Sequence, residues 1–249
     1  MQTNFRLVGA KSLFLAAALA ATMSAHADAT ITAIFGSGVG DNGWTAQTGN
    51  GVELALRARE RFPVPTNNVP SNGAGTYTFS DTTAYSLYGF NNLASWNFDF
   101  SINAGTASVN SYSYMLGIDS NPSLGVSFTS FDPLAVFNDN SFGNAGTTQG
   151  NGTDATAATK AGLAAANSIA QNSENFGWLS ALFNPTVDGT YSIYLEAFNQ
   201  AGGPVARTEI TVVVGDGGDR ELPEPASLAL VGVAAIGLAA VRRRRAAKA

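Results

Sequence analysis

The chain has 249 residues, which is enough for one or two domains with a sizeable hydrophobic core. Only 12% of the residues are charged, cysteine is absent and His26 is the only histidine, so a chain that has lost residues 1–27 can form no Ser-His-Asp triad, no Cys-His pair and no ordinary zinc site. Residues 28–225 contain all 18 acidic side chains but fewer than half of the 13 basic ones, and this acidity disfavours binding to nucleic acid.

The N-terminus has the three parts of a secretory signal peptide. A basic start precedes the apolar run 12–21, which is too short to span a bilayer, and the small residues Ala25 and Ala27 fit the pocket of a signal peptidase. Residues 1–27 are therefore predicted to be a signal peptide that directs the chain into the Sec export machinery. Cleavage after Ala27 leaves Asp28 as the first residue of the mature protein.

Residues 28–214 are predicted to form one mainly β domain. Asn-Gly pairs predict turns, and between them apolar and polar residues alternate as they do in half-buried strands. The expected architecture is an antiparallel β-sandwich of immunoglobulin-like or jelly-roll-like type. Trp96 shares a face with the phenylalanines of its run and is assigned to the core, whereas the helix-forming residues of 53–62 leave a helix open as an alternative there. The expected strands cover 52–58, 96–100, 112–118, 190–198 and 205–214.

One alanine-rich segment, residues 154–171, departs from this alternation. Its apolar residues recur at helical spacing, and Asp154 is placed to cap a first turn because a carboxylate can accept the unpaired amides there. We expect a helix, or an ordered loop packed on the sandwich, inserted before the last hairpin.

The last two strands, 190–198 and 205–214, form the clearest hairpin pattern. They resemble the closing pair of immunoglobulin-like and PKD-type modules. This resemblance implies that Tyr191, in Gly-Thr-Tyr, is a tyrosine corner with an inward ring and a hydroxyl bonded to the backbone.

The C-terminus contains a second signal. Residues 215–221 are rich in glycine and charge and predict a flexible tether, and two prolines stiffen the segment 222–225 that follows. The apolar run 226–241 predicts a short transmembrane helix of about 24 Å at 1.5 Å per residue. The basic tail 242–249 favours retention on the cytoplasmic side of the membrane, with the β domain outside.

This arrangement resembles the PEP-CTERM sorting-signal proteins of Gram-negative bacteria over residues 222–249. The resemblance implies that an exosortase recognises the chain, removes the helix and tail, and so converts a transient inner-membrane protein into one at the cell surface or outside the cell. Residue by residue it implies a recognition motif of Pro223, Glu224 and Pro225, and a cytoplasmic stop of Arg242, Arg243, Arg244 and Arg245. A permanent tail anchor is the alternative.

Carboxylates are the remaining acid-base groups, in pairs such as glycosidases use. Most of the candidates stand beside Asn, Ser, Pro or Gly, where bonding within a turn accounts for them. The candidates are Asp99, Asp119, Asp132, Asp139, Asp154 and Glu196.

Calcium and sugars are the other ligands to consider. Asp132, Asp139 and Asn140, or Asp216 and Asp219, offer oxygen ligands for calcium without the spacing of a twelve-residue calcium loop. Two tryptophans outside the alternating runs, Trp44 and Trp178, could be exposed and stack on sugar rings, although aromatic side chains more often pack inside a domain than bind ligands.

The sequence therefore predicts a non-enzymatic surface or matrix protein. No catalytic residue or cofactor is expected, and the resemblance implies an adhesive or structural role with exopolysaccharide as partner in a biofilm matrix. A carboxylate-based, glycan-active enzyme and a tail-anchored surface protein stay open as alternatives.

Overall fold

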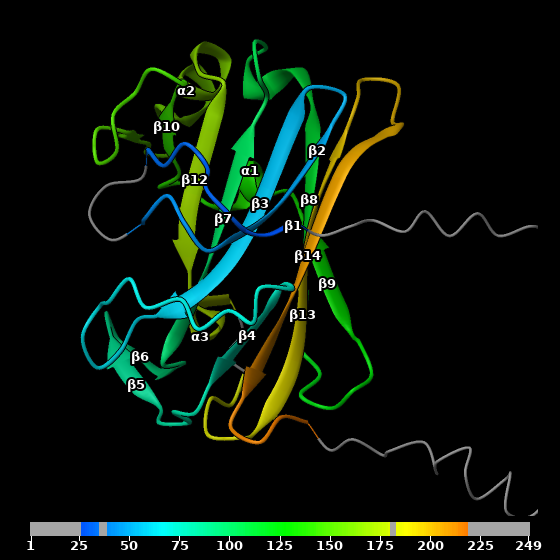
Figure 1. Ribbon diagram of the computed structural model, residues 1–249. Coiled ribbons are helices and arrows are strands. Elements are labelled where there is room, and N and C mark those ends of the chain that lie inside the picture. The colour runs from blue at the N-terminus through cyan, green and yellow to red at the C-terminus, as the bar shows by residue number, and fades with distance from the viewer. Residues whose placement is uncertain (1–25, 35–38, 180–182, 219–249) are drawn as a thin grey trace, which may run out of the picture.

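The computed structural model describes residues 26–34, 39–179 and 183–218. The predicted signal peptide, apart from its last two residues, and the predicted sorting signal lie outside these described residues. Within them the chain is mainly β, with sheets of seven, five and two strands and a few short helices (Figure 1). The expected fold class is thus confirmed at the level of a mainly β domain.

The seven-stranded sheet has the order β1-β2-β3-β7-β12-β10-β11, and the five-stranded sheet has the order β4-β14-β13-β8-β9. The strands of the first are β1 (His26–Ala29), β2 (Trp44–Gly49), β3 (Val52–Glu60), β7 (Trp96–Asn103), β12 (Ile169–Glu174), β10 (Ser141–Gly143) and β11 (Thr153–Asp154). Those of the second are β4 (Thr76–Phe79), β14 (Pro204–Val214), β13 (Gly189–Phe198), β8 (Ser113–Asp119) and β9 (Phe128–Phe131). The remaining elements are the hairpin β5 (Tyr85–Leu87) and β6 (Phe90–Leu93), the 3-10 helix η1 (Val109–Ser111), α1 (Pro133–Val136), α2 (Lys160–Ala166) and α3 (Phe176–Leu179).

The two larger sheets share one hydrophobic core. Because side chains alternate along a strand, every second residue of β3 and β7 points inward and meets the inward residues of β13 and β14. Leu56 and Phe100 from one sheet and Ile193 and Leu195 from the other are completely buried there. Trp96 is buried in this core, as predicted. One pair departs from the expected antiparallel pattern, because β4 lies parallel to β14. The immunoglobulin-like or jelly-roll-like topology stays a prediction.

The outer face of the seven-stranded sheet is buried as well. The prediction that β3 is a strand is confirmed against the helical alternative. The strand is not half-exposed as expected, because the side chains on its polar face are also covered: Arg57 is 0% exposed. This face is covered by residues 61–72 and by residues 26–34 and 39–43, here called the N-terminal segment. The backbone of the N-terminal segment is held by hydrogen bonds from Ile31 N to Asp41 O and from Ile34 N to Gln171 Oε1, each 2.8 Å long.

The alanine-rich segment forms a much shorter helix than predicted. The helix α2 covers only Lys160–Ala166, and its N-cap residue is Thr159. The last part of the predicted helix is instead strand β12, because β7 and β10 on its two sides supply partners for its backbone groups. Asp154 does not cap the helix, since it lies in β11 and accepts a hydrogen bond from Ser141 Oγ at 2.7 Å.

The predicted final hairpin is present as β13 and β14, joined by residues 199–203. The Tyr191 ring points inward and packs against Trp96 and Phe176, as the resemblance implied. A tyrosine hydroxyl bonded to the backbone a few residues upstream is found instead at Tyr114, whose Oη lies 3.0 Å from Val109 O.

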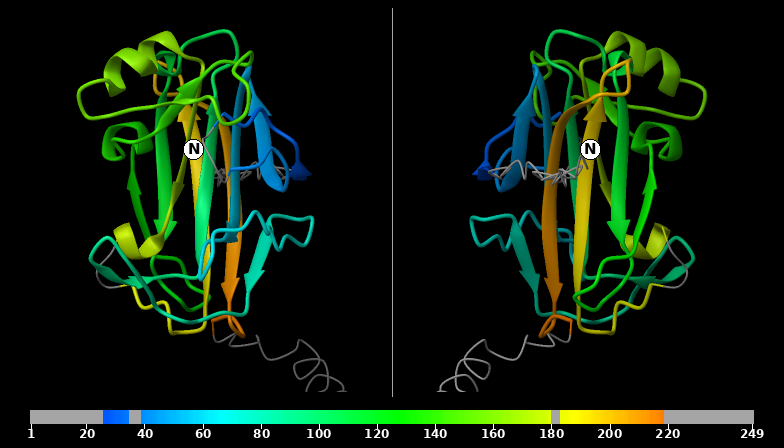
Figure 2. Two further views of the ribbon diagram at one scale, coloured as in Figure 1. Left: turned by 90° about the vertical axis from the view of Figure 1, so that its left-hand side faces the viewer. Right: turned by 90° about the vertical axis from the view of Figure 1, so that its right-hand side faces the viewer.

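The chain leaves the domain at one end. In both views of Figure 2 the described chain ends, in orange, at the lower end of the molecule. Residues 215–218, the start of the predicted tether, are hydrogen-bonded to the domain: Gly215 N donates to Phe79 O, Asp216 N to Asp188 Oδ2 and Gly218 N to Thr190 Oγ1.

Candidate functional site

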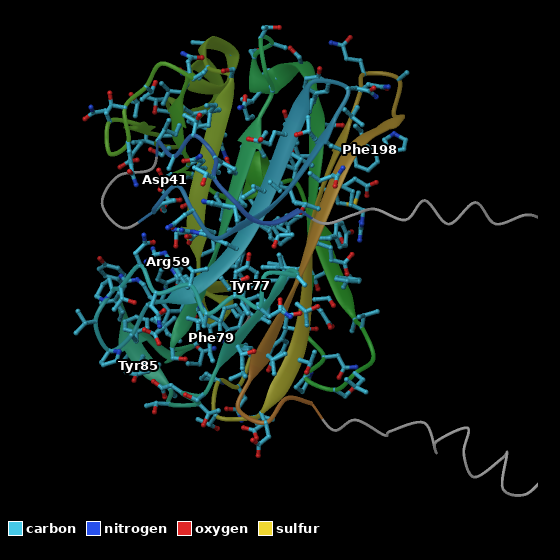
Figure 3. All side chains as sticks on the ribbon, in the orientation of Figure 1. Asp41, Arg59, Tyr77, Phe79, Tyr85 and Phe198 are labelled. Atoms are coloured by element: carbon cyan, nitrogen blue, oxygen red, sulfur yellow. The ribbon has the colours of Figure 1, made fainter. Side chains whose placement is uncertain are left out.

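An open cleft of about 600 Å³ is the strongest candidate for a ligand site among the described residues. Three segments far apart in the sequence build it. They are the turn between β5 and β6 with the first residue of β6, the end of α1 with the residues after it, and the end of β12 with α3. Tyr85 marks the position of this hairpin in Figure 3. The lining residues are Tyr88, Phe90, Val136, Phe137, Asn138, Asp139, Glu174, Trp178 and Leu179.

Aromatic side chains form one part of the cleft. Tyr88 is 83% exposed and Phe90 is 41% exposed, so two large rings stand in solvent. Tyr88 also has a φ of 53°, in the left-handed region that Gly and Asn favour, and it is followed by Gly89 at 87°. Trp178 on α3 is half-buried, and its buried indole Nε1 has no hydrogen-bond partner among the described residues. The rings of Tyr88 and Phe90 and the exposed part of the Trp178 ring can therefore contact a ligand, whereas the indole N–H is covered.

Two carboxylates form the polar part of the cleft. Glu174 ends β12 and is 6% exposed, whereas Asp139 is exposed and accepts a hydrogen bond from Asn172 Nδ2 at 3.1 Å. Burial, and to a smaller extent the negative charge of Asp139, raises the pKa of Glu174 to about 8. At neutral pH the cleft therefore contains one protonated carboxyl group as a hydrogen-bond donor, next to a second carboxyl group.

The proton on Glu174 makes the stability of the fold depend on pH. Glu174 titrates near 4.5 in the unfolded chain and near 8 in the folded protein, so its stabilising contribution is complete below pH 4.5 and is lost as the pH rises to 8. We expect Glu174→Gln to flatten this loss, which is on the order of 5 kcal/mol at about 1.4 kcal/mol per pKa unit. Urea unfolding of both proteins across this pH range measures the slope. Glu196→Gln, which makes the same change of charge on the other sheet, is the control, and equal slopes for the two variants would contradict the assignment.

The comparison with known proteins concerns the other end of the chain. A family model described as the PEP-CTERM protein-sorting motif matches residues 221–245. The chain carries a PEP-CTERM sorting motif. The motif implies an exported protein that is recognised by an exosortase and has a membrane-anchor tail. No curated protein and no solved structure matches the chain significantly. Among the described residues no helix is long and apolar enough to cross a membrane, and the PEP-CTERM segment lies outside them.

The carboxylates expected from the sequence are mostly placed in structural roles. Asp99 is buried between Arg57 and Arg59, and Asp119 accepts hydrogen bonds from the amides of two loop residues, as the turn interpretation predicted. Asp154 bonds Ser141, and Glu196 pairs with Arg207 at 3.2 Å. Of the six candidates only Asp139 lines the cleft.

The calcium candidates are close in sequence, but Asp132 has a different hydrogen-bond partner from Asp139 and Asn140. Asp132 caps α1 by accepting a hydrogen bond from Leu134 N at 2.9 Å. Asp139 and Asn140 both accept hydrogen bonds from Asn172 Nδ2. In residues 26–34, 39–179 and 183–218 no group of three or more His, Cys, Asp or Glu could hold a metal ion. Of the second pair, Asp219 lies outside the described residues, and calcium binding stays a prediction.

The two tryptophans considered for sugar stacking have different positions. Trp44 offers no exposed ring, because the N-terminal segment covers it: it is fully buried, donates Nε1–H to Gly40 O and packs under the guanidinium of Arg57 at 4.7 Å. Trp178 is half-buried and lines the cleft.

Sequence reasoning missed Glu174, Tyr88 and Phe90. Glu174 was hidden because the preceding residues were assigned to a helix rather than to β12. The hairpin of Tyr88 has the turn sequence Tyr-Gly, which lacks the usual Asn-Gly or Asp-Gly signal.

Proposed function

We propose that this protein is a non-enzymatic component of the cell surface or extracellular matrix, whose β domain binds a glycan such as exopolysaccharide in the cleft between the β5–β6 hairpin, α1 and α3. Export and sorting follow from the PEP-CTERM motif. The observation that supports glycan binding is the combination of exposed rings with carboxyl and amide groups in one cleft.

The chemistry of a sugar matches these two kinds of lining. A pyranose ring has an apolar C–H face, which can stack on an aromatic ring, and a rim of hydroxyl groups, which need hydrogen-bond partners. Tyr88, Phe90 and Trp178 supply the rings. Asn138 and Asp139 supply oxygen acceptors, and the protonated Glu174 supplies a donor.

Removing the rings should weaken this binding. We expect Tyr88→Ala and Trp178→Ala each to lower the affinity of the mature protein for its glycan about five- to tenfold or more, because a central aromatic contact contributes more than about 1 kcal/mol. A glycan array with purified cell polysaccharides, followed by titration of the best ligand, measures this. Phe128→Ala removes an exposed ring that does not line the cleft, and it should leave the affinity unchanged. Equal binding by all variants would contradict the proposal.

A glycan-active enzyme is the second candidate, and one observation favours it. A carboxyl group that stays protonated at neutral pH beside a second carboxyl group is the arrangement of the acid and base in glycosidases. Incubating the mature protein at high concentration with the polysaccharide it binds separates the two candidates. Release of shorter fragments that is abolished by Glu174→Gln would establish the enzyme, whereas an unchanged polymer supports simple binding.

A further inference from the structure

Exposed apolar side chains also gather at a second place, beside the point where the chain leaves the domain. Residues 120–127, here called the base loop, connect β8 to β9 and contain no charged residue. Leu124 is 44% exposed and Val126 is 59% exposed, and Val187 on the neighbouring loop is 42% exposed. Several exposed apolar residues on adjoining loops are a candidate interaction surface, whereas a single one is not.

The base loop is held in one conformation by the domain. Asp119 is buried and accepts hydrogen bonds from Asn121 N at 3.0 Å and Ser127 N at 2.7 Å, so its carboxylate joins the two ends of the loop. The carbonyl of Pro122 accepts a hydrogen bond from Thr190 N at 2.9 Å, which ties the loop to β13. Leu124 and Val126 therefore stay in solvent although the loop that carries them is ordered.

The exit of the chain lies directly against this loop. Gly218 N donates to Thr190 Oγ1 at 3.1 Å, and a Cβ on Gly218 would collide with the carbonyl oxygen of Pro122. The last described residue thus touches the base loop, and Figure 1 shows both at the lower end of the molecule.

The sequence limits how far this end can be from the bilayer. The apolar run that the sorting motif places in the membrane begins at Ala226, and only residues 219–225 separate it from Gly218. Even if this segment is fully extended, the Cα atoms of Gly218 and Ala226 lie no more than about 29 Å apart. The opposite end of the domain is much farther away, because the eleven residues of β14 alone span about 33 Å at about 3.3 Å each.

We propose that the base loop is a lipid-contact surface, which inserts Leu124 and Val126 among the headgroups of the bilayer while the precursor is anchored. This inference rests on the membrane-anchor tail that the PEP-CTERM motif implies and is independent of glycan binding. The contact is apolar rather than electrostatic, because the charged groups beside the loop, Asp188 and Asp216, are acidic. It orients the domain with its exit towards the membrane and with the loop 199–203 away from it.

The absence of cysteine allows a direct test with single labelled sites. Ser123→Cys places a fluorescent probe on the base loop, and Ala201→Cys places one at the opposite end, near Phe198 in Figure 3. The full precursor is purified from a host without exosortase and reconstituted into phosphatidylcholine vesicles that contain a lipid with a quencher near its headgroup. We expect several-fold stronger quenching at residue 123 than at residue 201. Equal quenching in protein that co-floats with the vesicles and unfolds cooperatively overturns the proposal.

A second variant separates lipid contact from mere nearness. Leu124→Asp with Val126→Asp, made in the Ser123→Cys chain, puts two charges on the loop. Both positions are exposed, so the fold is retained, as the unfolding transition verifies. We expect quenching at residue 123 to fall to near its value at residue 201. If the double variant is quenched like the parent, the short tether alone holds the loop near the lipid and the proposal of an apolar contact is wrong. Exosortase takes no part in either measurement, so neither result depends on processing.

Discussion

Replacing Pro223, Glu224 and Pro225 together by alanine should leave an unprocessed precursor in the membrane of a host that has an exosortase. The two prolines fix the backbone on either side of Glu224 and bias the segment towards an extended form, the shape that a protease cleft accepts. Alanine removes both the stiffness and the charge, so the enzyme loses its recognition site while the apolar run still holds the chain. We expect processing to fall from nearly complete to undetectable.

Cell fractionation and the intact mass of the product measure this outcome. The control changes Asp219 and Arg220 to alanine, two residues just before the matched segment 221–245, and should be processed normally. If the triple variant is released like the wild-type protein, the role given to the three residues is wrong. If the wild-type mature protein itself retains residues 226–249, the helix is a permanent tail anchor rather than a transient one.

Asp99→Ala should destabilise the fold more than other single charge deletions. The Asp99 carboxylate is completely buried and accepts hydrogen bonds from Arg57 Nε at 2.8 Å and Arg59 Nε at 3.0 Å. Its removal leaves two guanidinium groups without a counter-charge on the covered face of the seven-stranded sheet. Breaking a buried pair in this way costs about 3–5 kcal/mol, which is a large part of the total stability of a typical domain.

Urea unfolding measures this loss as a lower midpoint. Glu196→Ala is the matched control because it also deletes one carboxylate from an arginine pair, but Arg207 and Glu196 are both partly exposed, so the expected loss is below about 1 kcal/mol. A loss of similar size in the two variants would contradict the view that burial makes the carboxylate of the Arg57–Asp99–Arg59 cluster more costly to remove than an exposed one.

Local pattern determined the strands and the sorting signal. The alternation along Trp96, Phe98 and Phe100 predicted which side of β7 faces the core, because side chains of a strand point to opposite faces whatever the rest of the fold does. The PEP-CTERM motif was likewise recognisable from sequence because its parts are contiguous. Such features depend on neighbours along the chain.

The cleft could not be predicted in the same way. Tyr88, Asp139 and Glu174 come from three segments far apart in the sequence, and only the tertiary structure, in which β6 packs against α3, brings them to one surface. Asp139 was a candidate because it is a carboxylate, but nothing in the sequence distinguished it from the other candidates. The carboxylate of Asp119 is used by hydrogen bonds from loop amides, and that of Asp99 is neutralised by two arginines.

The sequence by itself determined that this protein is exported, carries a C-terminal sorting motif and is built mainly of strands, since each of these is written in residues that are adjacent or alternate along the chain. Only the tertiary structure decided which polar groups are buried, where the alanine-rich helix ends and which rings stand in solvent. The physical reason is that burial depends on what covers a face: the N-terminal segment covers Trp44 and Arg57, while no described segment covers Tyr88.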